Sequence, residues 1–253
     1  RARRDVDLGC PTGGSVNGSR FLLTESGAPG FLSTRFGENG GVPAHASSPE
    51  LLTLHAVRLL GFADEGKVAA RFRLDHDEAG ELLKDFEAYG WVYRTEFVGS
   101  GGWTLTRTGR SENERQLAAE LAACRASEEV KQVHAAFLPV NARFQETAIR
   151  WQVRPGPGDP MALNDHTDFR WDDRVIDALG AVGHRLASVI EDLSALLARF
   201  DGYSERYTAA LSRVQRGERR WVDGVGIDSC HVVWMQLHED LLGTLGIERG
   251  QED

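Results

Sequence analysis

The apolar residues of the chain first fall into a regular pattern just after residue 48. Ser48-Pro49-Glu50 is typical of a helix start, with a serine as N-cap, a proline in the first turn and then an acid. The apolar residues that follow recur at helical spacing and predict one buried face: Leu51, Leu54, Val57 and Leu60. Gly61 is expected to end this helix.

Two more helices are predicted before the pattern changes. A short helix covers about residues 67–72. A longer helix covers residues 75–89, where Asp75 and Glu78 resemble a capping box. Its inward face is expected to hold Leu82, Leu83 and Phe86. Gly90 is the expected left-handed stop.

From residue 91 the spacing changes from that of a helix to that of strands. Residues 91–98 are rich in aromatic and β-branched side chains, residues 99–102 read Gly-Ser-Gly-Gly, and residues 103–106 form a second β-rich run. Two strands around a glycine-rich turn predict a β-hairpin. A fourth helix is expected from about residue 108 to residue 124.

The order helix, helix, turn, helix, hairpin, helix is that of a winged helix-turn-helix domain. The stretch KVAARFRLDHDEAGELLKDFEAYGWVYRTEF, continued by GWTLTRTGRSENERQLAAEL, resembles the MarR-type winged helix of bacterial transcription regulators. The most similar parts are Gly90-Trp91-Val92 after the third helix and Leu105-Thr106-Arg107-Thr108-Gly109-Arg110 after the wing. The resemblance covers about residues 48–125. It implies that the third helix enters the major groove of DNA while the wing touches the backbone or the minor groove.

The residues after 126 are predicted to be almost wholly helical. Helices are expected at about 128–153, 174–200 and 204–216 and from 228 or 229 to 245, and four helices can close a bundle. Pro139 should kink or split the first of them. In the second, a nearly heptad seam is expected to bury against neighbouring helices or against a second copy of the protein: Val175, Leu179, Val182, Leu186, Ile190, Leu193, Leu197 and Phe200.

The expected fold class is mainly α with a small β-hairpin wing. Residues 1–47 are interpreted as a flexible or weakly ordered leader, because glycine and serine are frequent there. Residues 48–125 form the winged helix-turn-helix domain, and residues 126–253 a C-terminal α-helical bundle for dimerisation or ligand sensing.

The composition narrows the class of protein. Hydrophobic residues make up 41% and charged residues 26%, as in a soluble globular protein. No apolar run is long enough to span a membrane, and no apolar run follows the N-terminal arginines as in a secretory signal. The three cysteines form no CxxC pair, so neither a disulfide framework nor a cysteine zinc site is expected. A cytoplasmic location follows as the default.

Seven basic residues of the predicted winged helix could contact double-stranded DNA. Lys84 of the third helix would meet the groove, and six could neutralise phosphates: Lys67, Arg71, Arg73, Arg94, Arg107 and Arg110. Two features oppose this function. The net charge is −9, whereas DNA-binding domains usually carry a basic footprint. The third helix carries six acids that would repel phosphates: Asp75, Asp77, Glu78, Glu81, Asp85 and Glu87.

Polar residues that could do chemistry gather in the C-terminal half. A ligand or metal site made of His166, Asp168, His231 and His238 is conceivable. However, a separation of seven residues places the last two about 10.5 Å apart along one helix face, and no HExxH motif is present. Helix caps and histidines that satisfy buried carbonyl groups explain the same residues. No catalytic residue and no cofactor is therefore expected.

The sequence leaves three hypotheses of function. The first is a cytoplasmic, homodimeric transcription regulator that binds DNA through the winged helix and dimerises or senses a small-molecule effector through the bundle. The second is a regulatory adaptor that uses the winged helix to contact another protein and does not bind DNA. The third, with the least support, is a metal-dependent enzyme in the helical domain.

Overall fold

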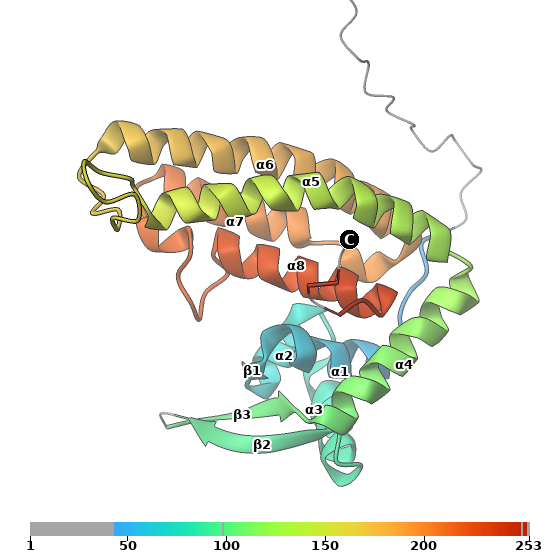
Figure 1. The fold of residues 1–253 in the computed structure, drawn as a ribbon. Coiled ribbons are helices and arrows are strands. Elements are labelled where there is room, and N and C mark those ends of the chain that lie inside the picture. The colour runs from blue at the N-terminus through green and yellow to red at the C-terminus, as the bar shows by residue number, and fades with distance from the viewer. Residues whose placement is uncertain (1–42, 98, 249, 252–253) are drawn as a thin grey trace, which may run out of the picture. The chain divides into compact units, whose positions relative to one another are not determined.

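The computed structural model describes residues 43–97, 99–248 and 250–251. The fold is mainly α-helical with a small antiparallel sheet before the long helices, which confirms the predicted class (Figure 1). Residues 1–42 of the expected leader lie outside the described residues. The last part of the expected leader, residues 43–47, is held by His45. The N–H of His45 donates to the carbonyl of Leu196 (3.0 Å), and its carbonyl accepts from the N–H of Ala198 (2.9 Å).

Three helices and three short strands form the first part of the fold, which we call the sheet lobe (residues 49–105). The helices are α1 (Pro49–Leu60), α2 (Glu65–Arg71) and α3 (His76–Ala88), and the strands are β1 (Phe62–Ala63), β2 (Val92–Phe97) and β3 (Ser100–Leu105). β3 is central and pairs antiparallel with both neighbours. The core of the sheet lobe includes Leu54, Val57, Val68, Leu83, Phe86, Val92 and Trp103.

Helices α1 and α3 begin where their sequence signals predict, and α2 begins at Glu65, two residues before the expected start, with Asp64 as its N-cap. The Ser48 hydroxyl accepts a hydrogen bond from the N–H of Leu51 (3.3 Å), and the Asp75 carboxylate accepts from two N–H groups of the first turn of α3 (3.0 Å each). Each such cap stabilises a helix by about 1 kcal/mol. Gly61, at φ 72°, ends α1.

The sheet differs from the prediction in two respects. β3 begins at Ser100, so the hairpin connection is shorter than the turn expected at residues 99–102. β1 was not expected, because two residues are too few for a periodic pattern. It forms only because Phe62 and Ala63 find paired positions opposite Thr104 and Trp103 of β3.

Helix α4 (Arg107–Cys124) leads from the sheet lobe to four further helices, which we call the helical bundle. These are α5 (Ser127–Gln152), α6 (Phe169–Leu196), α7 (Tyr203–Gln215) and α8 (Cys230–Leu245). The 3-10 turn η1 (Ala198–Phe200) connects α6 to α7, and η2 (Arg219–Trp221) lies between α7 and α8. Figure 1 shows α5 and α6 as long neighbours, with α8 on the side of the sheet lobe.

The heptad-like seam of α6 and η1 is buried within the chain itself. Each of its eight side chains, from Val175 to Phe200, is at most 4% exposed. Helices α5 and α7 pack on α6, so a second copy of the protein is not needed to cover the seam. Within the described residues, no helix has the length and apolarity needed to cross a membrane.

Pro139 does not split α5, and a prediction of two helices here would be wrong. The helix is continuous from residue 127 to residue 152. Phe137 before the proline and Phe144 after it both stack on Trp234 of α8, with ring centroids 5.4 and 4.3 Å away. Packing of both halves on one indole stabilises the continuous helix against the ~3 kcal/mol that an internal proline costs.

A set of buried polar side chains lies between the two hydrophobic cores, and we call it the polar layer. It consists of His55, Asn113, Glu120, Arg199, Tyr203, Asp240 and Thr244. Arg199 is at its centre: Nε donates to Glu120 Oε2 (3.0 Å), Nη2 donates to Thr244 Oγ1 (2.7 Å), and Nη1 pairs with Asp240.

Helix α1 joins the polar layer through His55. Its Nε2 lies 3.0 Å from Asp240 Oδ1, and its Nδ1 lies 3.1 Å from Asn113 Oδ1. Tyr203 donates its hydroxyl to the other oxygen of Asp240 (2.9 Å). One carboxylate of α8 therefore receives groups from α1, η1 and α7, which ties the sheet lobe to the helical bundle.

A second arginine, Arg58 of α1, fastens the sheet lobe to α8. Its Nε donates to Glu239 Oε1 (2.9 Å), and its Nη1 pairs with Glu114 Oε1 (3.2 Å). A Cβ atom at Gly243 would approach Arg58 Cζ to 3.1 Å. The glycine therefore leaves the space in which the guanidinium lies against α8.

The polar layer makes stability depend on pH. Burial by itself raises the pKa of Asp240, but the neighbouring Arg199 and His55 outweigh it and hold that pKa well below its usual range. A carboxyl whose pKa is lowered by folding stabilises the protein above its unfolded pKa, and this contribution is lost as the pH falls toward the folded pKa.

We predict that Asp240→Asn lowers the free energy of unfolding by about 3 kcal/mol at neutral pH, because Arg199 keeps its buried charge and loses a counter-charge. The difference from the wild type should shrink as the pH falls below about 4, where the wild-type carboxylate begins to lose its contribution. Urea unfolding at several pH values measures both effects. The exposed Asp177 of α6 provides the control Asp177→Asn, and equal effects of the two changes would contradict the prediction.

Candidate functional site

Two of the three basic residues of α2 and its exit that are predicted to contact DNA lie at the boundary with the helical bundle. The Arg71 guanidinium carbon is 4.4 Å from the ring centroids of both Phe72 and Tyr203, and Tyr203 belongs to α7. Arg73 reaches Glu205 of α7 (3.4 Å). Lys67 pairs with Asp64 at the start of its own helix (3.0 Å). Two of these three cations therefore contact the bundle.

Of the other four cations predicted to contact DNA, two form ion pairs and two are exposed to solvent. Lys84 pairs with Glu81 one turn earlier in α3 (2.7 Å), and Arg110 pairs with Glu239 of α8 (3.1 Å). Arg94 of β2 and Arg107 of α4 are exposed. Within the described part of the chain, neither has an acidic group at ion-pair distance. The seven cations do not form one basic stripe.

The exposed side of α3 is acidic. All six of its acids are solvent-exposed, while the buried side consists of Ala79, Gly80, Leu83 and Phe86. Three acids lie in the cap and first turn, where negative charge favours the helix dipole. Asp85 and Glu87 lie at the C-terminal end, where negative charge is unfavourable and the last turn carries no basic residue. Glu87 accepts a hydrogen bond from the backbone N–H of Arg94 in β2 (3.4 Å), whereas the charge of Asp85 is not explained by the stability of α3.

A cleft of about 1390 Å³ lies between the sheet lobe and the helical bundle. Its walls come from α1, β1 and α2 on one side and from η1, α7, α8 and residues 225–228 on the other. Seven Lys and Arg residues line it against four acids, although the whole chain is acidic. The basic residues are Arg58, Lys67, Arg71, Arg73, Arg110, Arg199 and Arg206.

Arg206 of α7 is the main bundle cation of this cleft. It forms a two-pronged pair with Asp228, at 2.8 Å for both Nε and Nη2, and Nη2 also donates to Gln236 (2.6 Å). Burial lowers the pKa of Arg206, but the bond with Asp228 outweighs this effect and raises it. The same bond outweighs burial at Asp228 and lowers its pKa.

The sequence interpretation missed the bundle side of this cleft. Arg199, Asp240 and Arg206 were not singled out, although the first two are charged residues among the apolar residues of η1 and α8. A charge in an apolar stripe is a signal for a buried pair. The sequence does not show which distant residue is its partner.

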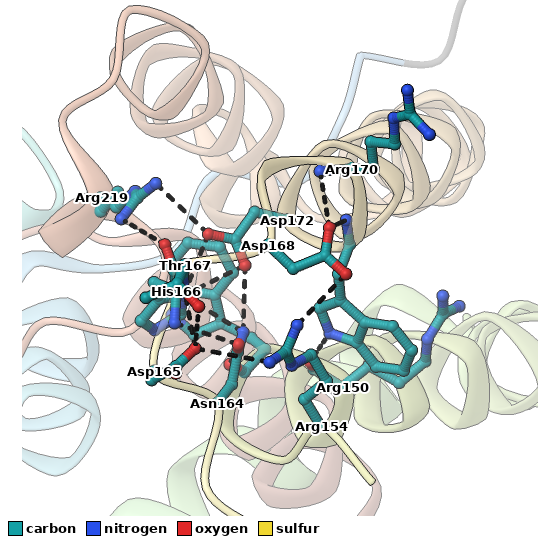
Figure 2. Close-up of polar contacts among 12 residues, drawn as sticks. Arg150, Arg154, Asn164, Asp165, His166, Thr167, Asp168, Arg170, Asp172 and Arg219 are labelled. Atoms are coloured by element: carbon teal, nitrogen blue, oxygen red, sulfur yellow. Dashed lines mark hydrogen bonds and ion pairs between the residues drawn. The ribbon is translucent and has the colours of Figure 1, made fainter. Parts of the chain in front are cut away.

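His166 and Asp168 lie at the corner between α5 and α6, where they form part of a polar network. His166 Nδ1 is 3.1 Å from both carboxylate oxygens of the buried Asp172. Asn164 donates to the same carboxylate (3.0 Å), and Arg219 of η2 approaches it at 3.4 Å. Figure 2 shows these groups converging on Asp172.

Asp168 has a different role from its neighbour His166. It caps α6 by accepting from the N–H groups of Arg170 and Trp171 (3.1 and 3.2 Å), and it pairs with Arg154 (3.2 Å) (Figure 2). The His166 backbone is left-handed, at φ 57°, and its ring lies tilted against Trp151, with the ring centroids 4.3 Å apart. The corner therefore ties η2 and the ends of α5 and α6 together.

The two histidines of α8 pack on aromatic rings of α5. His231 stacks on Phe144 (6.2 Å) and His238 lies beside Phe137 (5.7 Å). Both line a groove of about 640 Å³ between α5 and α8. Burial raises the pKa of the neighbouring Cys230 to about 12, so its thiol is not a ready nucleophile.

The structure does not bring His166, Asp168, His231 and His238 into one metal site. Among the described residues, no group of three or more His, Cys, Asp or Glu side chains is arranged to hold a metal ion. His166 and Asp168 belong to the corner network, and the two α8 histidines line the groove beside α5.

We predict that Asp172→Ala lowers the free energy of unfolding by about 1–3 kcal/mol, because it removes the buried carboxylate that accepts from Asn164 and pairs with His166 and Arg219. The adjacent Asp173 is exposed and provides the matched control. Asp173→Ala should change stability by less than about 0.5 kcal/mol. Chemical unfolding of both variants measures the effects, and a stability loss of similar size in the control would contradict the assigned role.

The candidate surfaces of this chain are thus the exposed acidic side of α3, the cleft between the sheet lobe and the bundle, and the groove between α5 and α8. Comparisons of the chain with models of protein families, with curated protein sequences and with solved structures find no match.

Proposed function

We propose that the protein is a regulatory adaptor. In this proposal the sheet lobe is a winged helix that contacts another protein through the exposed side of α3. The partner would present a cationic surface, because this side of α3 is lined by carboxylates. The observation that carries the proposal is the negative charge on the exposed side of α3. This is the helix that a DNA-binding winged helix would place in the major groove.

The architecture supports the winged-helix part of the proposal. Three helices are followed by an antiparallel hairpin and then by α4, and a third short strand pairs with the hairpin. This element order agrees with the resemblance found in the sequence. A fold of this kind hosts several functions, so the function must come from its surface.

The position of the acids supports protein contact over DNA contact. Glu81, Asp85 and Glu87 lie beyond the first turn of α3, and all three are exposed. Asp85 and Glu87 oppose the helix dipole, so they do not serve the stability of the isolated helix. A polyanion such as DNA would be repelled by them, whereas Lys and Arg side chains of a protein would be attracted.

DNA binding is the second candidate function, and one observation favours it. Arg94 and Arg107 are exposed near the hairpin and have no acidic partner at ion-pair distance within the described residues. Arginine suits the geometry of phosphate groups. These two residues are the contacts on which such a function would depend.

The two functions differ in their salt dependence and in the residues on which they rest. We expect fluorescence anisotropy to show no binding of the full chain to labelled genomic duplexes at roughly 50 or 200 mM salt.

We also expect a triple variant, Glu81→Gln, Asp85→Asn and Glu87→Gln, to lose a protein that the wild type captures from an extract of its source cells. A matched variant, Asp173→Asn with Asp177→Asn, should retain that protein.

Salt-sensitive binding of DNA that is lost in Arg94→Ala and Arg107→Ala would establish the second candidate and overturn the adaptor proposal. Capture that survives the triple change would show that the acidic side of α3 is not the contact surface. Circular dichroism of each variant confirms that the helices are retained, since all of these positions are exposed.

A further inference from the structure

We infer that the cleft between the sheet lobe and the helical bundle is a binding site for a small organic phosphate, with Arg71 and Arg206 as its main anion-binding groups. The inference goes beyond the adaptor function and does not depend on it, because it rests on the cleft and not on the exposed side of α3.

Arg71 carries the first argument. Its Nε and Nη2 atoms are shielded from solvent and have no hydrogen-bond partner among the described residues. These two nitrogens form one edge of the guanidinium group, which matches two oxygens of a phosphate. A buried donor without a partner is costly, so an oxyanion that accepts from both atoms would be stabilised.

The aromatic contacts of Arg71 support a role in binding. The guanidinium carbon lies 4.4 Å from the ring centroids of Phe72 and Tyr203. These rings limit the positions of the side chain, which reduces the entropy that an arginine loses when it holds a ligand. Arg71 also lines the cleft, so a ligand bound there would lie beside this side chain.

Arg206 supplies a second incomplete group beside the first. Its guanidinium carbon lies 5.6 Å from the centroid of the same Tyr203 ring. Asp228 and Gln236 occupy Nε and Nη2, but the buried Nη1 has no hydrogen-bond partner among the described residues. The unused N–H groups of the two arginines thus lie on either side of the boundary between α2 and α7. The hydroxyl of Ser47, which also lines the cleft, is another buried group without a hydrogen-bond partner.

The surroundings indicate the class of ligand. Six of the seven lining cations pair with acids, whereas Arg71 has no carboxylate at ion-pair distance among the described residues, and an unpaired cation in the cleft favours an anion. Donors from several side chains suit the three oxygens of a phosphate better than the two of a carboxylate. The cleft, at about 1390 Å³, also has apolar walls from Leu52, Leu59, Phe62, Val232 and Met235. This volume and these walls favour a phosphate carried on an organic group.

Isothermal titration calorimetry of the full chain tests the inference with phenyl phosphate as the probe. We expect phenyl phosphate to bind about tenfold more tightly than phenylacetate or inorganic phosphate, since the first lacks the phosphate and the second lacks the apolar group. Arg71→Gln should weaken the binding of phenyl phosphate by about tenfold or more. Arg185→Gln, an exposed change on α6 away from the cleft, should leave it unchanged.

A second variant tests the site in the opposite direction. Asp228→Asn removes the carboxylate that competes for Arg206, so it should tighten the binding of phenyl phosphate. The thermal unfolding of each unliganded variant shows whether the fold is retained.

The inference is overturned if phenyl phosphate does not bind, if phenylacetate binds as tightly, or if Arg71→Gln folds and binds like the wild type. Unchanged or weaker binding to a folded Asp228→Asn variant would also overturn it. Failure here would leave the adaptor proposal intact, because α3 and its acids do not line the cleft.

Discussion

The buried carboxylate of Asp240, which is paired with Arg199, is the constraint on which the arrangement of the chain depends. The sheet lobe and the helical bundle each have a hydrophobic core, and apolar packing alone would allow several ways of placing one against the other. Asp240 also receives His55 from α1 and Tyr203 from α7. Displacement of the sheet lobe along α8 would separate His55 from Asp240 and Arg58 from Glu239, which would leave buried polar groups unpaired at a cost of several kcal/mol.

The placement of the sheet lobe on the helical bundle determines which basic residues are exposed to solvent. With α1 held on α8, helix α2 lies at the bundle, and Arg71 and Arg73 contact side chains of α7. Arg110 likewise forms an ion pair with Glu239 of α8. The acids of α3 have no such partners in the bundle and remain in solvent. An acidic outer surface and a basic inner cleft therefore arise from the same placement of one lobe on the other.

The sequence predicts the parts of this fold that depend on local signals. The N-caps at Ser48 and Asp75, the end of α1 at Gly61 and the apolar seam of α6 are all found where the residue pattern places them. Strand β1 and the polar layer could not be predicted in this way, because each depends on partners far along the chain. Pro139 shows the same limit, since Trp234 of α8 holds together a helix that its own sequence would interrupt. The candidate cations were identified by residue type alone, and only the fold reveals that most of them already have contacts.

The close approach of Arg58 to Gly243 has a consequence for how such a protein can diverge. A glycine inside a helix costs about 0.5–1 kcal/mol relative to alanine, and here it makes room for a guanidinium. Replacing the glycine alone brings a Cβ atom against Arg58, while replacing the arginine alone leaves Glu239 with one cation fewer. A change at one of these two positions therefore alters the space or the charge at the other. Related chains that keep this docking should show correlated changes at positions 58 and 243.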